Sequence, residues 1–180
     1  GSSSDANMDV GNEIGGNTPA TGNTITNWGS GAIANPTFLS SSGTIFGILV
    51  NHQKSEKISY NNITSANLTG ATGAATRGIY KRYSNGLPSG VFTADINNNT
   101  ITITNNLTVG IASFIGIDCV ELSSASPSAT FNINNNLLSN ISIGATNTNF
   151  FGISTIAQVG VMNINDNIIR GTTMAGTGSF

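Results

Sequence analysis

The stretch FTADINNNTITITNN, Phe92 to Asn106, decides the fold because it alternates apolar and polar residues around three consecutive asparagines. Phe92, Ala94 and Ile96 occupy every second position, which is typical of a β-strand with one buried face. Asparagine is depleted from strands, since its side chain competes for backbone hydrogen bonds. We therefore expect the asparagines to mark a corner between two strands.

The same corner recurs along the chain. An isoleucine is followed three residues later by an asparagine, and two residues further on by isoleucine or leucine. The clear copies place this asparagine at Asn61, Asn99, Asn136 and Asn167, and a weaker copy has Asn23. From Asn23 onward the steps between copies are 38, 38, 37 and 31 residues. Such a period indicates one supersecondary unit that stacks on its neighbours.

A second element, a Gly-Ile pair, keeps pace with the asparagine. Its glycines are Gly47, Gly78, Gly116 and Gly152. The last three follow the preceding asparagine by 17, 17 and 16 residues, whereas the arc from glycine to the next asparagine varies from 14 to 21 residues. Insertions confined to one arc are typical of a solenoid.

These patterns predict an all-β fold, a parallel β-helix of about 4–5 coils of roughly 31–38 residues each. Residues 1–180 are expected to form a single β-helix segment, with clear repeats over residues 23–169. The predicted Asn ladder has its asparagines in the left-handed backbone conformation at one corner, each amide donating to the next. Its members are Asn61, Asn99, Asn136 and Asn167. The alternative is an antiparallel sandwich with asparagines in exposed loops.

The composition excludes several classes of protein. Only 8% of the residues are charged, the net charge is −2, and there are six Lys and Arg in total, so a nucleic-acid partner is not expected. The longest apolar run, IFGILV (45–50), is far shorter than the ~20 residues that span a bilayer, so membrane insertion is not expected either. Isoleucine at regular positions argues against disorder.

Units such as GIY…INNNTIT and GIS…MNINDNII resemble the right-handed parallel β-helix repeats of large Asn/Thr/Gly-rich secreted or surface proteins of Bacteroidetes-type bacteria. The resemblance covers about residues 23–169. It implies an extracellular or cell-surface location and a non-enzymatic structural or adhesin-like rod. The same fold hosts polysaccharide lyases and glycoside hydrolases, so a fragment of such an enzyme is an alternative.

No constellation of residues predicts catalysis. Aligning the coils on the Gly-Ile pair places four residues in one outward column: Leu49, Tyr80, Asp118 and Ser154. The column holds a single acid, whereas the enzyme alternative needs a second acid, or Lys or Arg, close to Asp118. His52 is predicted to lie in a surface loop, and Cys119 to be a buried structural thiol.

No cofactor is predicted, and no Cys/His cluster suits zinc. The run NINDN (163–167) offers oxygen ligands for Ca²⁺ as an alternative, although with a single carboxylate. The segment RGIYKRYSNG (77–86) combines aromatic and cationic side chains, which suits weak contacts with surface glycans. The predicted glycan contacts are Arg77, Tyr80, Lys81, Arg82, Tyr83 and Asp118. A solvated strand end is the other interpretation of this segment, and Trp28 either contacts a ligand or covers the first coil.

The repeats predict coils that are open at both ends. After Asn167 the next Gly-Ile pair would fall near residue 183 or 184, beyond Phe180. An uncapped coil exposes backbone edges and apolar side chains. Its partners would be further repeats of the same polypeptide or copies of the chain stacked end to end. The second case makes a self-assembling extracellular filament the other alternative function.

Overall fold

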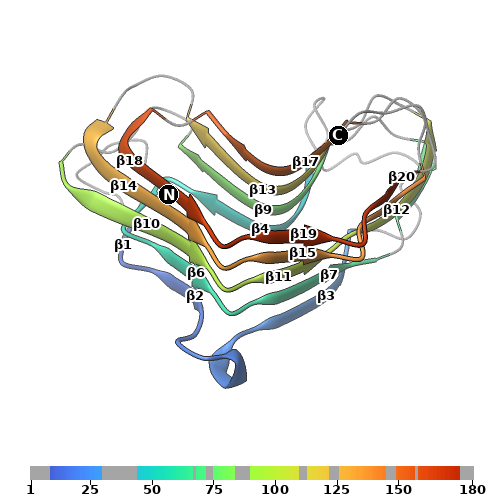
Figure 1. Cartoon of the computed structure of the whole chain (residues 1–180), viewed down its shortest axis with the longest axis horizontal. Coiled ribbons are helices and arrows are strands. Elements are labelled where there is room, and N and C mark those ends of the chain that lie inside the picture. Colours follow the sequence, from blue (N-terminus) through green and yellow to red (C-terminus); the bar gives the residue numbers. More distant parts are fainter. Residues whose placement is uncertain are drawn as a thin grey trace.

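The computed structural model describes residues 9–29, 44–66, 68–71, 75–83, 90–109, 113–121, 126–144, 149–156 and 158–174. Among these residues the protein is all-β, with one short 3-10 turn, η2 (Pro19–Thr21), and no α-helix. Four large sheets contain most of the strands (Figure 1). A two-stranded sheet joins β1 (Asp9–Val10) to β5 (Gln53–Lys54).

The sheets are numbered here in the order in which the chain visits them. The first sheet comprises β2 (Glu13–Gly15), β6 (Lys57–Ser59), β10 (Phe92–Asn97), β14 (Ser126–Asn134) and β18 (Val159–Asn165). The second comprises β3 (Thr24–Trp28), β7 (Asn62–Ser65), β11 (Thr100–Thr102), β15 (Leu137–Ser139) and β19 (Ile168–Arg170). The third comprises β8 (Leu68–Ala71), β12 (Thr104–Val109), β16 (Ser142–Ile143) and β20 (Thr173–Met174). The fourth comprises β4 (Thr44–Asn51), β9 (Ala75–Tyr83), β13 (Ser113–Glu121) and β17 (Asn149–Thr155).

The chain passes through the sheets in a repeating order, for example β6, β7, β8 and β9, and then β10 beside β6. One such circuit is called a pass here. Each strand pairs in parallel with its equivalents in the neighbouring passes, so the passes stack as Figure 1 shows. The predictions of an all-β chain and of parallel pairing are confirmed. All strand pairs among the described residues are parallel, which excludes the antiparallel sandwich there.

Aligned apolar side chains form the core. In the first sheet one inward column contains Ile14, Ile58, Ile96, Ile133 and Ile164. Its three middle members are at most 1% exposed, because each is covered by the like residue above and below. Strand β10 alternates buried and half-buried residues along its length, as the period-two pattern of Phe92, Ala94 and Ile96 predicts.

The Gly-Ile pair is explained by the close approach of the fourth sheet to the second. A Cβ atom on Gly78 would lie 2.7 Å from Ile101 Cγ2 and 2.6 Å from the Gly116 carbonyl oxygen. Gly78 and Ile79 are both buried, so the strict alternation of β9 is interrupted between them. A side chain at this column would separate the two sheets, which is why glycine recurs there.

The corner itself differs by one residue from the prediction. The left-handed backbone belongs to the residue before each ladder asparagine: Tyr60, Asn98, Asn135 and Asp166, with φ between 55° and 60°. The prediction that the ladder asparagines themselves adopt this conformation is wrong. The turn is made one position earlier, and it leaves Asn61, Asn99 and Asn136 buried at 1% exposure.

Candidate functional site

A ladder of asparagine side chains runs along the inner corner between the first and second sheets. The Nδ2 atom of Asn61 donates to Oδ1 of Asn99 at 2.9 Å, Asn99 donates to Asn136 at 3.0 Å, and Asn136 donates to Asn167 at 2.9 Å. Asn23 joins the ladder by donating to Asn61 at 3.1 Å. The structure thus contains the amide-to-amide hydrogen bonds expected from the sequence.

The side-chain amides of four ladder members also bond the backbone: Asn61, Asn99, Asn136 and Asn167. For Asn99, Nδ2 donates to the Ile58 carbonyl oxygen at 2.8 Å, and Oδ1 accepts the backbone N–H of Asn61 at 3.0 Å. The equivalent Nδ2 bonds recur at Asn61 and Asn136, and the equivalent Oδ1 bonds recur at Asn136 and Asn167. Buried amides without partners would destabilise the fold, so the ladder both satisfies these groups and fixes the register between passes.

A second ladder on the outer face of the first sheet was not anticipated. Asn132 donates from Nδ2 to Asp95 Oδ1 at 2.7 Å, and Asn163 donates to Asn132 Oδ1 at 2.8 Å. Asn97 and Asn134 likewise each accept a backbone N–H from the next pass, at 2.9 and 3.0 Å. Asparagines that vary between repeats therefore still link the passes, although only half-buried.

The residues predicted to contact glycans divide between the two faces of β9. Arg77, Tyr80 and Arg82 are half-buried on the outer face, where the Arg77 guanidinium lies 4.4 Å from the centre of the Tyr80 ring. Lys81 and Tyr83 are each only 1% exposed and face the core. The expectation that Lys81 and Tyr83 lie at the surface is wrong, since the adjacent buried pair Gly78 and Ile79 shifts the alternation by one residue.

Asp118 occupies the predicted column, aligned with Tyr80 and Ser154. Its carboxylate is not available at the surface, however: the side chain is 2% exposed, and Oδ2 lies 2.5 Å from Arg77 Nε. The acid-plus-arginine pair that the enzyme alternative required near Asp118 is therefore present, but as a closed ion pair. This ion pair links the neighbouring strands β9 and β13 on the outer face of the fourth sheet.

A buried ion pair lies inside the molecule, where sequence patterns gave no sign of one. Lys81 Nζ lies 2.6 Å from Glu56 Oε1, and each side chain is 1% exposed. Lys81 also donates to the Gln53 carbonyl oxygen at 3.0 Å and lies 3.8 Å from the centre of the Tyr83 ring. Burial raises the pKa of Glu56 above its usual value of 4.5, and the attraction of Lys81 opposes that rise.

The other residues considered in the sequence, His52, Cys119 and Trp28, are buried in the core or packed against it. His52 is 3% exposed and adopts a left-handed conformation with φ of 53° between β4 and β5, so its predicted surface position is wrong. Cys119 is fully buried, as expected, and burial raises the pKa of its thiol to about 12. Trp28 packs against the core beside Gly47.

No group of three or more His, Cys, Asp or Glu side chains that suits a metal ion occurs among the described residues. The side chains of Asn163 and Asn167, in the run proposed for Ca²⁺, are bonded to the preceding pass. Calcium binding at that run stays a prediction.

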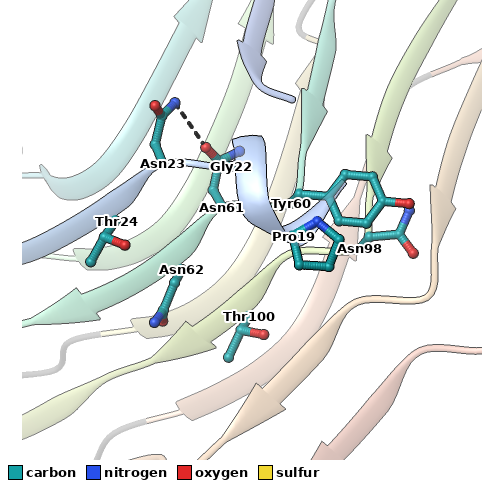
Figure 2. Close-up of a pocket in the computed structure, with 9 residues that line it drawn as sticks. All are labelled: Pro19, Gly22, Asn23, Thr24, Tyr60, Asn61, Asn62, Asn98 and Thr100. Carbon is teal, nitrogen blue, oxygen red and sulfur yellow. Dashed lines mark hydrogen bonds between the residues drawn. The ribbon is translucent and has the colours of Figure 1, made fainter. Parts of the chain in front are cut away.

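A cavity of about 340 Å³ opens at the outer side of the corner, at the first three passes. Pro19 and Gly22 of the η2 segment and Tyr60 line one side, while Thr24, Asn62 and Thr100 stand on adjacent strands β3, β7 and β11 (Figure 2). Asn23, Asn61 and Asn98 complete the lining. The cavity presents amides, hydroxyl groups and one aromatic ring.

No protein family, curated protein or solved structure matches this chain. The resemblance to bacterial surface-protein repeats therefore stays a prediction. Within the described part of the chain, no helix has the length and apolar character needed to cross a membrane.

Proposed function

We propose that this chain is a segment of a right-handed parallel β-helix that serves outside the cell as a non-enzymatic structural or adhesin-like rod. The observation that carries the proposal is the continuity of the inner ladder, whose amides join Asn23 to Asn167 through every intervening pass. The ladder and the aligned apolar columns repeat the same contacts from each pass to the next. A repeat of this kind gives length and rigidity without a specialised site.

The distribution of acids supports a rod over a polysaccharide-degrading enzyme. Asp118 and Glu56 are buried beside the cations Arg77 and Lys81. Asp95, on the outer face, accepts a hydrogen bond from Asn132. Catalysis on a glycan requires two acids, or an acid with Lys or Arg, that reach the substrate together, and these acids are bound to protein partners.

Single-molecule pulling from the two termini tests the rod directly. We expect unfolding in steps that each release about one pass, on the order of 12 nm of chain for 37 residues at ~3.4 Å per residue. The variant Asn99→Ala, which interrupts the ladder, should unfold at lower force, whereas Asn132→Ala should not. Release of new reducing or unsaturated ends from polygalacturonate, alginate or xylan by the purified chain would contradict the proposal and favour the enzyme.

One observation favours a filament subunit as a second candidate. In the last pass that the structure describes, Ile164 is 43% and Ile169 48% exposed, whereas Ile133 and Leu138 in the preceding pass are 1% and 0% exposed; a further repeat or a second copy of the chain would cover them. The ladder is also directional, since each Nδ2 donates toward the following pass. The side-chain Nδ2 of Asn167 in one copy could therefore donate to the side-chain Oδ1 of Asn23 in another.

Sedimentation velocity over a hundredfold range of protein concentration tests this candidate. A filament subunit should form larger species as the concentration rises, and the double variant Ile164→Ser/Ile169→Ser should abolish them. Exposed Val91, distant from this end in the sequence, supplies the control substitution Val91→Ser. A wild-type chain that stays monomeric throughout contradicts the filament and leaves the rod.

A further inference from the structure

The corner cavity has a lining of a distinctive chemical kind. None of the nine residues that line it is charged. Asn62, Asn98, Thr24 and Thr100 supply donors and acceptors, and Tyr60 and Pro19 supply ring faces (Figure 2). Its volume of about 340 Å³ falls at the lower end of the ~300–1,000 Å³ range of small-molecule sites. The ligand that fits such a lining is small, neutral and rich in hydroxyl groups, with an apolar face.

The wall opposite the strands is fixed in place before any ligand arrives. Thr18 and Thr21 bond each other across η2 through backbone and side-chain groups. Lys57 holds the start of the segment by bonding the Asn17 side chain and, at 3.1 Å, Glu13. The Gly16 N–H donates to the Ser59 carbonyl oxygen at 3.1 Å. A pre-ordered wall lowers the entropy lost on binding.

Tyr60 is an exception within its own column. The equivalent corner residues of the later passes are Asn98, Asn135 and Asp166, and all four share the left-handed conformation. Asparagine suits this conformation better than tyrosine, since it visits the left-handed region more readily. A tyrosine is thus held in a conformation that it adopts rarely, at the one corner where the η2 segment faces it. The residue that follows η2, Gly22, packs directly against the backbone of Tyr60, since a Cβ atom on Gly22 would collide with the Tyr60 carbonyl oxygen.

We propose that this cavity binds the end of a neutral oligosaccharide. The Tyr60 ring stacks on the apolar C–H face of a sugar, and the amides and hydroxyl groups of Asn62, Asn98 and Thr100 bond its hydroxyl groups. This site is separate from the outer face of β9, where the sequence predicted glycan contacts. It does not rest on the proposed rod function, since a monomer or a filament would carry the same cavity.

The test is a titration of the isotopically labelled protein, followed by NMR, with five neutral hexasaccharides: cellohexaose, xylohexaose, laminarihexaose, mannohexaose and chitohexaose. We expect at least one to shift the backbone amides of Asn62, Asn98 and Thr100. Tyr60→Asn should weaken that binding at least tenfold. This variant gives the Tyr60 position the asparagine that the next two passes carry at the equivalent corner. The variant should therefore still fold, and a thermal melt would verify this. Val91→Asn, at an exposed position just before β10 and outside the cavity lining, should leave the affinity unchanged.

Three results would overturn the proposal. One is the absence of cavity shifts with all five sugars at millimolar concentration. Another is binding that Tyr60→Asn leaves intact or that Val91→Asn abolishes. The last is tighter binding of hexagalacturonate than of every neutral sugar at the same amides, since the uncharged lining offers a carboxylate no cation.

Discussion

Replacing Asn99 tests the ladder most sharply, because its side chain is buried in the middle of the stack. Four hydrogen bonds of 2.8–3.0 Å depend on it, linking it to Ile58, Asn61 and Asn136. At roughly 0.5–1.5 kcal/mol each, and with buried groups left unpaired, Asn99→Ala should lower the free energy of unfolding by about 3–5 kcal/mol. That is a large part of the ~5–15 kcal/mol that stabilises a typical domain.

A near-isosteric variant separates hydrogen bonding from packing. In Asn99→Asp the second carboxylate oxygen would face the acceptors Ile58 O and Asn136 Oδ1, so the ionised form should destabilise the fold at least as much as alanine. Stability should return as the pH falls and the aspartate takes up a proton.

Urea unfolding followed by far-UV circular dichroism measures both variants, with Asn132→Ala as the matched control from the half-buried outer ladder. The control should lose no more than about 1 kcal/mol. If Asn99→Ala lost no more than Asn132→Ala, or if Asn99→Asp were as stable as the wild type at neutral pH, the inner ladder would not hold the passes together.

The other predictions concern buried groups. Lys81→Met should cost about 3–5 kcal/mol because it strands Glu56 in the core, and the double variant Lys81→Met/Glu56→Leu should recover most of that loss in urea melts; equal losses would contradict an ion pair. Burial raises the pKa of Glu56 in the folded protein above 4.5. The contribution of Glu56 to the free energy of unfolding should therefore be complete below pH 4.5 and should fall as the pH rises through its folded-state pKa. Glu56→Gln should remove this part of the pH dependence of unfolding. Gly78→Ala should cost about 1–3 kcal/mol through overpacking against the second sheet, and an unchanged melting temperature would contradict the close approach of the two sheets. With its pKa at about 12, the Cys119 thiol should not react with an aromatic disulfide reagent at pH 8 until urea unfolds the chain; rapid reaction of the native protein would contradict its burial.

The sequence could reveal the stacking because the repeat constrains it at two points. The constant arc from asparagine to glycine fixes one position at the corner before the second sheet and one in the fourth sheet, and a shift between passes would break both columns. Ladder bonding followed from the same argument, since equivalent amides in stacked passes must face one another. The conformation of the corner did not follow, because consecutive asparagines such as Asn98 and Asn99 suit the left-handed position equally well.

Side-chain direction within β9 depends on the residue from which the alternation is counted: from the outward Tyr80, Lys81 and Tyr83 face inward, as observed. Strict alternation from Arg77 places Lys81 and Tyr83 outside, but Gly78 and Ile79 both face inward and reverse the direction for the rest of the strand. The burial of a lysine there becomes possible only because Glu56, distant in the sequence, lies within 2.6 Å. No local pattern contains that information.

The spacing of residues in the sequence could have indicated the corner cavity. From Ile14 to Asn23 the chain takes nine residues, whereas Ile58 to Asn61 takes three. The extra residues form the η2 segment that walls the cavity. An insertion at a corner that is otherwise tight, beside the only aromatic residue of the corner column, is the signal.

The central claim, that the chain is a rod of stacked parallel passes, is tested most directly by one distance. Thr24, Asn62, Thr100, Leu137 and Ile168 occupy a single outward column of the second sheet, one residue from each pass. Spin labels at Thr24→Cys and Ile168→Cys are therefore four strand spacings apart, or ~19 Å between Cα atoms at ~4.8 Å per step. Pulsed electron spin resonance should give a single narrow distribution near that value, allowing for the label arms. A distribution centred far beyond it, or one spread over tens of ångströms, would contradict the stacked rod.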